Sequence, residues 1–482
     1  MEKEKYTTTV GLEIHAELKT RTKMFCDSKN DPNETRQNVN VCPVCMGHPG
    51  TLPAINKEAV KHVLKVGVAI GGKLADTTSF DRKNYFYPDI PKGYQISQYK
   101  SPLVSGGSLN GVAITRVHLE EDTGTLLHDK GNYSLLDFNR AGVPLMELVT
   151  EPVIHSAKEA ADFAREFQLL LRYIGASDAN MEKGEMRIEA NISISEKMDV
   201  KNGKLGTKVE VKNLNSFKAV ERVIEYEMKR QIALIESGGK IIQETRGWDD
   251  ANQTTFSQRK KESSHDYRYF PEPDLPILAV SDIPEFSVAA LKKVLPELPV
   301  EKRTRYAKEG LVPLCVEMFV ADTRYGSLFE ETSSYISTVG KSSTAVSVLI
   351  ANYISTDIAG LAAKHGENGL LPITPQGLGV CLLRLLNGEM SSRGVKDALA
   401  EVFEKGGDLA EISKKYVQQS DSAELSKIID GVLEANKETI IDFKNGKQSA
   451  LQFLVGQSMK ATRGTGNPQV LRELLLKEML LR

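Results

Sequence analysis

Three adjacent acidic residues, Glu120, Glu121 and Asp122, follow a run that alternates as a strand does, in TRVHLEEDTG (115–124). Neighbouring carboxylates repel one another unless a cation or hydrogen-bond donors offset their charge. Taken alone, such a triplet is most often a solvated turn. The alternative is a site where a metal ion gathers negative groups, and the polar residues elsewhere in the chain favour it.

The same alternation recurs in three other stretches, GLEIHAEL (11–18), GEMRIEANIS (184–193) and TKVEVKNLN (207–215). Side chains on a strand alternate between its two faces, so apolar residues take one face and polar residues the other. Half-buried antiparallel strands that face water would alternate in the same way. However, these polar faces collect Glu, His and Asn, whereas solvated strand faces usually carry Thr, Lys and Ser.

If the four strands share one sheet, a set of metal-binding side chains converges on one concave surface: Glu13, His15, Glu120, Glu189 and Glu210. Carboxylates gathered in one place need a cation. Oxygen ligands with one imidazole and several waters suit Mg²⁺, in particular when a phosphate supplies a further ligand. The pattern therefore predicts a carboxylate-rich Mg²⁺ site.

The segment FDRKNYFYPDIPKGYQISQY (80–99) combines aromatic residues, lysines, Pro and Gly, and it is too irregular for a core element. Lys83 and Lys92 are suited to meet anions, and Tyr85 to stack on a base or a sugar. We predict a binding loop, with a self-packed surface loop as the alternative.

Three cysteines, Cys26, Cys42 and Cys45, lie at spacing C-x15-C-x2-C in a segment rich in turn residues. A CxxC pair with a third Cys nearby favours zinc, although structural zinc usually has four ligands. Ser28, Asp27 and His48 are the candidates for the fourth. A thiol cluster without metal is the alternative.

The composition narrows the class of protein. The 482 residues include 62 basic and 64 acidic side chains, a net charge of −2, which argues against nucleic-acid binding by bulk charge. No apolar run approaches the roughly 18 residues of a membrane span, and the first residues lack the apolar core of a signal peptide. Five cysteines, an odd number, favour a reducing compartment over a disulfide framework. We therefore expect a soluble, cytoplasmic protein without a membrane partner.

Residues 1–285 mix strand patterns with two clear helices. One helix begins at Ser156, which forms a capping box with Glu159, and ends at Gly175; the other runs from about Phe217 to Glu236. The Pro-rich passage YFPEPDLPILAVSDIPEF (269–286) marks a boundary, beyond which the pattern is helical. Residues 441–482 carry seven Lys and Arg against three Asp and Glu, a net charge of +4, so this tail either touches a nucleic-acid backbone or is an ordinary solvated surface.

Common nucleotide-binding motifs are absent from the sequence. GKSS (340–343) is the nearest match to a Walker A loop, but Tyr335 stands where that loop has its first Gly. If the chain uses ATP, it does so without a common nucleotide fold.

Several of these stretches together resemble the signature blocks of the GatB family, the B subunits of aspartyl/glutamyl-tRNA amidotransferases. They are VGLEIHAELKTRTKMFC, CPVCMGHPGTLP, FDRKNYFYPDIPKGYQISQY, HLEEDTG, LDFNRAGVPLMELVTEP, EVKNLNSF and HDYRYFPEPDLP, in order over residues 10–276. SALQFLVGQSMKATRGTGNP (449–468) resembles the C-terminal domain that this family shares with YqeY-like proteins. The chain has no room for the large insertion of the archaeal E-type relatives, which favours the B type.

The resemblance implies an α+β protein: an antiparallel, β-rich cradle over residues 1–285, an all-α helical domain over 286–405 and a small YqeY-like helical tail over 406–482. It also implies a heterotrimer in which an A subunit hydrolyses glutamine to ammonia and a small C subunit lies between A and B. The B subunit would bind Glu-tRNA(Gln) or Asp-tRNA(Asn), phosphorylate the side-chain carboxylate with ATP, and let ammonia displace the phosphate.

The resemblance further implies roles for individual residues. Catalytic roles fall to Glu121, His15, Lys83 and Lys92, with Glu121 at the mouth of the ammonia route and both lysines as its neighbours. ATP and Mg²⁺ would be handled by Glu13, Glu120, Glu189, Glu210, Arg187 and Asn213, with His15 as a further metal ligand. tRNA would be bound by Tyr85, Arg140, Lys460 and Arg463. Zinc-bearing members carry C-x-C where this chain has Ser28, so zinc at Cys26, Cys42 and Cys45 would need another fourth ligand.

Two other functions fit parts of the sequence. A tRNA-binding scaffold subunit without chemistry of its own would need the basic tail but not the carboxylates. A free-standing, metal-dependent ligase of the ATP-grasp type would need the carboxylates but no amidase partner.

Overall fold

The computed structural model describes residues 5–127, 131–197, 204–260, 268–366, 369–417, 422–444, 446–462 and 466–481. The chain forms two compact units, Met1–Pro299 and Val300–Arg482. The first unit is built on a large sheet with helices, and the second is helical in its described part. The predicted α+β class is confirmed.

The main sheet of the first unit has ten strands in the described residues, in the order β15-β14-β13-β12-β1-β11-β8-β6-β2, with β7 paired to β8. Its strand pairs are antiparallel except for β13 with β14. The strands are β1 (Tyr6–Glu17), β2 (Lys73–Leu74), β6 (Val104–Ser105), β7 (Ser108–Leu109), β8 (Val112–Glu121), β11 (Pro144–Thr150), β12 (Met186–Glu196), β13 (Val209–Leu214), β14 (Glu244–Asp249) and β15 (Thr254–Lys260).

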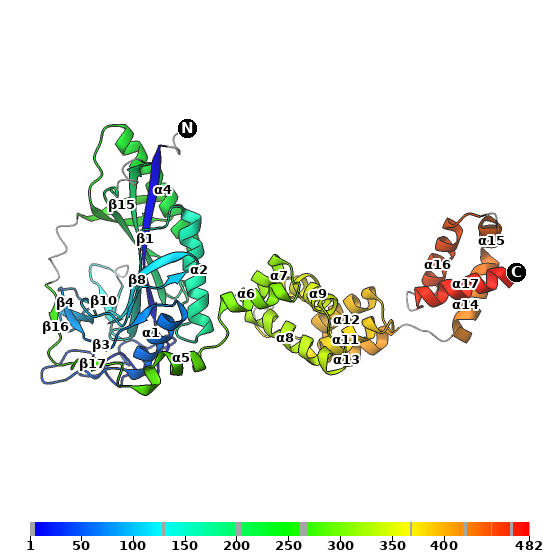
Figure 1. Cartoon of the computed structure of the whole chain (residues 1–482), viewed down its shortest axis with the longest axis horizontal. Helices are drawn as coiled ribbons and strands as arrows, with labels where there is room; N and C mark the ends of the chain where they lie inside the picture. The colour runs from blue at the N-terminus through cyan, green and yellow to red at the C-terminus, as the bar shows by residue number, and fades with distance from the viewer. Residues whose placement is uncertain are drawn as a thin grey trace. The chain divides into compact units, whose positions relative to one another are not determined.

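Three helices cover the apolar face of this sheet: α1 (Lys57–Ala69), α2 (Ala157–Tyr173) and α4 (Phe217–Glu236). Figure 1 shows α2 and α4 on the same side of β1. Leu12 and Ile14 of β1 are fully buried in the same core as Phe163 and Phe167 of α2. Because strand side chains alternate, this packing turns Glu13 and His15 to the opposite face.

The sequence located two of these helices correctly and missed the third. Ser156 caps α2 by accepting a hydrogen bond from the Glu159 backbone N–H. The Glu159 carboxylate, however, accepts from the backbone of His155 and not from Ser156, so the capping box is shifted by one residue. Asn56 caps the missed helix α1, accepting from the backbone N–H groups of Glu58 and Ala59.

Strand register brings the polar residues of different strands into lateral contact. Glu13 on β1 lies opposite Glu189 on β12, and His15 lies opposite Glu147 on β11. Glu147 in turn lies opposite His118 on β8. The four predicted strands therefore lie in one sheet, with β11 inserted between β1 and β8.

The segment 80–99 is more regular than the predicted binding loop. It forms a hairpin of β4 (Asp81–Asn84) and β5 (Tyr94–Ser97), to which β16 (Phe270–Pro271) adds a third strand. β5 packs against β8. Two small sheets, β9 (Thr125–Leu127) with β10 (Leu135–Asp137) and β3 (Thr77–Thr78) with β17 (Leu278–Ala279), complete the strands.

The first unit extends beyond residue 285, because η3 (Pro284–Phe286) and α5 (Val288–Val294) bury Phe286 and Leu291 in its core. The helices that follow are α6 (Pro299–Lys308), α7 (Pro313–Ala321), α8 (Thr323–Thr338), α9 (Thr344–Asn352), the π-helical η4 (Tyr353–Ile358), α10 (Ala359–His365), α11 (Pro375–Leu386), α12 (Ser392–Lys405), α13 (Leu409–Ile412), η5 (Ser413–Tyr416), α14 (Ser422–Ala435), α15 (Lys437–Lys444), α16 (Ser449–Ala461) and α17 (Pro468–Leu481). Helices α14 to α17 share a hydrophobic core of their own. The division into three domains at 285 and 405 stays a prediction.

One helical stretch is long and apolar enough to cross a membrane, by length and composition alone. Thr344–His365 has a mean hydropathy of 1.4, and 33% of its apolar window is buried within the unit. Asn352 and Asp357 interrupt its apolar residues, so it does not form a continuous apolar run in the sequence. Core helices of soluble proteins meet the same criterion, and Asp357 forms an ion pair with Lys396 of α12 at 3.0 Å.

Candidate functional site

The polar face of the main sheet lines a pocket with a cavity volume of about 770 Å³, here termed the carboxylate pocket. The sequence-predicted residues that line it are Glu13, His15, Lys83, Tyr85, Glu120, Arg140, Arg187, Glu189 and Asn213. Glu210 lies beside it, within ligand distance of Glu13 and Glu189. Side chains from separate parts of the chain thus meet, as the strand alternation predicts.

Three of these groups form the first metal-sized cluster, which we call the His15 triad: His15, Glu120 and Glu147. Their ligand atoms all lie within 4.8 Å of one another. His15 Nε2 is 3.2 Å from Glu147 Oε2, and the Ser97 hydroxyl donates to Glu120 Oε1 at 3.1 Å. Two carboxylates and one imidazole, with an open pocket for water or phosphate, fit Mg²⁺.

Charge within the His15 triad is balanced by its neighbours. Burial opposes protonation of His15, but the hydrogen bond and charge of Glu147 outweigh it and raise the pKa of His15 to about 9. Burial also opposes ionisation of Glu147, yet His118 and His15 hold the pKa of Glu147 well below its usual value. His15 is therefore protonated in this cluster, and its positive charge offsets part of the charge of the two carboxylates. A metal ion bound by His15 would displace that proton.

His118 supports this triad from beside it. Its Nε2 lies 3.1 Å from Glu120 Oε1 and 3.6 Å from Glu147 Oε2. The side chain is buried, and its Nδ1 has no hydrogen-bond partner in the described part of the chain. A buried nitrogen without an acceptor favours the tautomer that carries its hydrogen on Nε2. His118 thus acts as a donor that holds two carboxylates close together.

A second cluster, the Glu13 triad, consists of Glu13, Glu189 and Glu210, whose ligand atoms also lie within 4.8 Å of one another. Lys212 Nζ is 2.7 Å from Glu189 Oε2 and 4.0 Å from Glu210 Oε1. Burial and the nearby carboxylates, Glu147 first among them, raise the pKa of Glu13. This triad already contains an ammonium group as its counter-charge.

A third polar group borders the carboxylate pocket. Arg187 Nη2 donates to both oxygens of Asp122, at 3.0 and 2.8 Å. Although burial opposes its ionisation, the charges of Arg187 and Arg140 hold the pKa of Asp122 below its usual value. Glu17 lies beside this pair, and burial together with Asp122 raises its pKa to about 8. Arg187 and Arg140 are therefore engaged with Asp122 while they line the pocket.

The structure separates the two lysines that the sequence analysis placed together beside Glu121. Lys83 lines the carboxylate pocket, where burial opposes its charge but Glu120 and other groups raise its pKa well above the usual value. Placing Lys83 next to Glu121 was wrong, because Lys83 lies on the Glu120 side of β8. Lys92 is the true neighbour, with its Nζ 2.6 Å from Glu121 Oε2.

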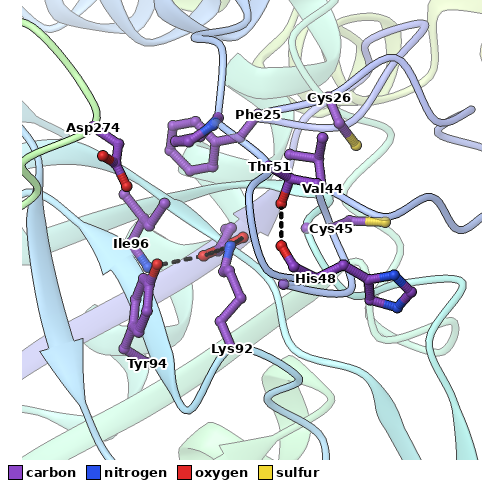
Figure 2. Close-up of a pocket in the computed structure, with 14 residues that line it drawn as sticks. Phe25, Cys26, Val44, Cys45, His48, Thr51, Lys92, Tyr94, Ile96 and Asp274 are labelled. Carbon is purple, nitrogen blue, oxygen red and sulfur yellow. Dashed lines mark hydrogen bonds and ion pairs between the residues drawn. The ribbon is translucent and has the colours of Figure 1, made fainter.

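Glu121 lies in a different cavity, the thiol pocket, of about 130 Å³. Besides Lys92, the backbone N–H of Ile96 donates to Glu121 Oε1 at 2.9 Å. Figure 2 shows Lys92 and Tyr94 across this pocket from Cys26 and Cys45. Glu120 and Glu121 point away from each other, as successive residues of a strand do, because their side chains line separate cavities.

Cys26, Cys42 and Cys45 come together at this second cavity, with their sulfur atoms within 4.8 Å of one another. The Ser28 hydroxyl is 3.8 Å from Cys45 Sγ, and the buried Lys23 Nζ is also 3.8 Å from it. A hydrogen bond from Cys26 is the largest cause that lowers the pKa of Cys45 to about 4. Three sulfur donors with one ready thiolate fit a zinc site in which Ser28 or water completes the ligand set.

A third cavity, of about 10 Å³, shares lining residues with both of these cavities. It shares Cys45, Lys92, Glu121 and Gly142 with the thiol pocket, and Gln95 and Asp122 with the carboxylate pocket. Gly142 has φ of +87°, and a Cβ there would lie 3.9 Å from Glu121 Oε2 and 3.4 Å from Cys45 Cβ. Glu121 and Gly142 therefore line both the thiol pocket and the smaller cavity.

Two protein-family models match this chain, and together they cover the site residues. A family model described as the GatB/GatE catalytic domain matches residues 8–283, and one described as the GatB domain matches residues 334–479. The chain belongs to the GatB/GatE family. The two matched regions include every sequence-predicted site residue, the first covering both triads and the thiols and the second covering Lys460 and Arg463.

The family's curated members align with nearly the whole chain. A protein of Crocosphaera subtropica, named as the B subunit of an aspartyl/glutamyl-tRNA(Asn/Gln) amidotransferase, is 42% identical over 98% of this chain and 98% of its own length. The protein of that name from Carboxydothermus hydrogenoformans is 41% identical over the same shares. A protein of Ostreococcus lucimarinus, named as the chloroplastic/mitochondrial B subunit of a glutamyl-tRNA(Gln) amidotransferase, is 42% identical over 98% of this chain and 96% of its own length.

The GatB domain carries the two tail residues predicted to bind tRNA. Lys460 is exposed in the last turn of α16. Arg463 lies outside the described residues.

No role was assigned from the sequence to Glu147, His118 or Lys212. Glu147 is the lone acid in the apolar strand PLMELVT, and such an acid is costly to bury unless it serves a site. His118 and Lys212 stand two residues from Glu120 and Glu210, on the same strand faces. This two-residue spacing was the feature of the sequence that could have identified His118 and Lys212 as site residues.

Proposed function

We propose that this chain is the B subunit of a glutamine-dependent tRNA amidotransferase, which converts Glu-tRNA(Gln) to Gln-tRNA(Gln) and Asp-tRNA(Asn) to Asn-tRNA(Asn). The full-length similarity to proteins named as such subunits supports this role. The observation that carries the chemistry is the pair of acidic triads at one pocket, with a second cavity beside Glu121. Phosphoryl transfer to a carboxylate brings anions together, and such a pocket is suited to gather the cations it needs.

In the first step, a side-chain oxygen of the tRNA-linked Glu or Asp attacks the γ-phosphorus of ATP and releases ADP. Mg²⁺, when bound, offsets the charge of the phosphates. The His15 triad would hold that ion, while Glu13, Glu189, Glu210 and Asn213 face the nucleotide. Arg187 and Lys83 line the same pocket and would orient phosphate oxygens. The product is an acyl phosphate.

In the second step, ammonia attacks the carbonyl carbon of the acyl phosphate and inorganic phosphate leaves. Ammonium that reaches the thiol pocket is attracted by Glu121, which accepts its proton, so that neutral ammonia continues past Gly142. Lys92 fixes the Glu121 carboxylate through the 2.6 Å contact. His15 and Lys83 would act on the carboxylate side of β8, where the reacting groups meet.

The proposed partners follow from this reaction. An amidase A subunit would supply ammonia at the thiol pocket, and a small C subunit would complete a heterotrimer in the cytoplasm. Tyr85, which lines the carboxylate pocket, and Arg140 at its edge would contact the acceptor end of the tRNA. Lys460 and Arg463 would contact its backbone.

The test is a single turnover of γ-labelled ATP by the reconstituted heterotrimer with Glu-tRNA(Gln) and no ammonia donor. We expect transfer of label to the tRNA-linked carboxylate, or release as phosphate that depends on the charged tRNA, and loss of both in Glu120→Ala. A scaffold without chemistry would leave amide formation intact in Glu120→Ala and lose it on removal of residues 422–482. Full activity without an amidase would instead indicate a free-standing ligase.

A further inference from the structure

We propose that Lys212 is a built-in cation of the Glu13 triad, so that without nucleotide the carboxylate pocket binds a single divalent ion, at the His15 triad. When ATP binds, Lys212 leaves the triad for the phosphates and a second ion takes its place. This inference rests on the proposed function, because it concerns the same pocket and assigns Lys212 a role in it.

The contacts of Lys212 define its place in the triad. Its Nζ is 2.7 Å from Glu189 and 4.0 Å from Glu210. Two further donors to the triad are neutral: Asn191 Nδ2 donates to Glu13 at 2.8 Å, and the Thr245 hydroxyl donates to Glu210 at 2.6 Å. A divalent ion bound by all three carboxylates would come close to the ammonium, and the two cations would repel each other.

The two triads differ in the ligands they offer. The His15 triad contains an imidazole, which coordinates metal ions through a nitrogen lone pair. The Glu13 triad contains oxygen atoms alone, and an ammonium group lies at hydrogen-bond distance from one of them. Arg116 Nη2 lies 3.8 Å from Glu147 of the first triad, beyond hydrogen-bond distance, whereas metal binding at the second triad requires the hydrogen-bonded Lys212 side chain to move.

Lys212 is positioned to make that movement. Its side chain is 38% exposed and lines the carboxylate pocket. The next residue, Asn213, has φ of +58°, and the pairing of β12 with β13 shifts register beside it. Such irregularities next to a site re-aim side chains. An ammonium on a flexible four-carbon stem can follow an incoming phosphate into the pocket.

The test counts bound Mn²⁺ by electron paramagnetic resonance in the full-length chain, with and without a non-hydrolysable ATP analogue. For the unmodified chain we expect one ion without nucleotide and two with it. Lys212→Met should bind two ions without nucleotide, and its second site should be at least about tenfold tighter than in the unmodified chain. Lys212→Gln gives the same test if the Met variant folds poorly.

Two control variants test whether the number of bound ions depends on the positive charge at position 212. Lys212→Arg keeps a cation at the triad and should bind one ion without nucleotide. Lys208→Met removes the same charge from an exposed position just before β13 and should also bind one.

The outcomes separate the inference from the proposed function. A single ion in both Lys212→Met and Lys212→Gln without nucleotide overturns the role of Lys212 but leaves the His15 site intact. Two bound ions in the unmodified chain without nucleotide would also overturn the role of Lys212 and leave the His15 site intact. No bound Mn²⁺ in any variant overturns the metal site on which the proposed function depends.

Discussion

Glu120 and Glu121 are adjacent in the chain, yet their carboxylates lie in different cavities on the two sides of β8. Glu120 accepts a hydrogen bond from Ser97 and belongs to the His15 triad. Glu121 accepts from Lys92 and from the backbone of Ile96. One strand thus supplies both the proposed phosphorylation site and the proposed ammonia entrance, because successive side chains on a strand point in opposite directions.

This arrangement predicts that substitutions at the two residues have separable effects. Glu120→Gln should lower phosphoryl transfer by at least about 100-fold, because a metal ligand is lost. Glu121→Gln should leave phosphoryl transfer nearly unchanged and lower amide formation about 10- to 100-fold, because proton removal from ammonium is lost. Single-turnover assays of the heterotrimer measure both steps. An equal loss of both steps in each variant would contradict the separation.

His118 should control the affinity of the site for Mg²⁺ without being a ligand. His118→Leu removes the donor between Glu120 and Glu147, so the Mg²⁺ concentration for half-maximal phosphoryl transfer should rise about 10- to 100-fold. His118→Gln can place an N–H near the Nε2 position and should recover most of that affinity. If the Gln variant behaves like Leu, or if kcat falls with an unchanged Mg²⁺ dependence, the positioning role is refuted.

Glu17 should make the stability of the chain depend on pH. Its pKa is raised from 4.5 to about 8 in the folded chain, by burial and by Asp122. Below pH 4.5 the group is protonated in both states and has no effect on stability. Between pH 4.5 and about 8 the unfolded chain releases this proton first, so stability falls as pH rises and the loss is complete above about pH 8.

Glu17→Gln should therefore stabilise the chain at pH 8.5 by on the order of a few kcal/mol, since one pKa unit corresponds to about 1.4 kcal/mol. At pH 4.5 the variant should match the unmodified chain. Urea denaturation at both pH values measures the difference, and Glu225→Gln, at an exposed position on α4, serves as the control. An equal effect of Glu17→Gln at both pH values would refute the raised pKa.

The thiol site should hold zinc for local structure and not for phosphoryl transfer. We expect about one zinc ion in each full-length chain by elemental analysis, lost in Cys42→Ser. Loss should expose residues 26–56 to proteolysis but leave phosphoryl transfer unchanged, because the thiols lie on the far side of β8 from the His15 triad. Cys315→Ser, a buried thiol of α7, should keep the zinc. Equal zinc content in Cys42→Ser and the unmodified chain would show that these thiols do not hold it.

Local sequence rules predicted four strands of the site and two of the helices that cover their sheet. Alternation in GLEIHAEL and its three counterparts is sufficient to place Glu13, Glu120, Glu189 and Glu210 on polar faces, because side-chain direction on a strand depends only on residue parity. The same parity rule accounts for the opposite directions of Glu120 and Glu121. The pair Gly238-Gly239 marked the end of the helix from Phe217 to Glu236, and the structure shows that Ser216 caps its start.

Which of these residues share a site was decided by the tertiary structure. Glu147 joins His15 and Glu120 because β11 inserts between β1 and β8, and a single sequence does not specify that strand order. Lys83 and Lys92 lie nine residues apart on one hairpin, and only the packing of that hairpin on β8 assigns each lysine to a different side. The sequence determined the direction of each side chain through local geometry, whereas contacts between distant strands determined which side chains meet.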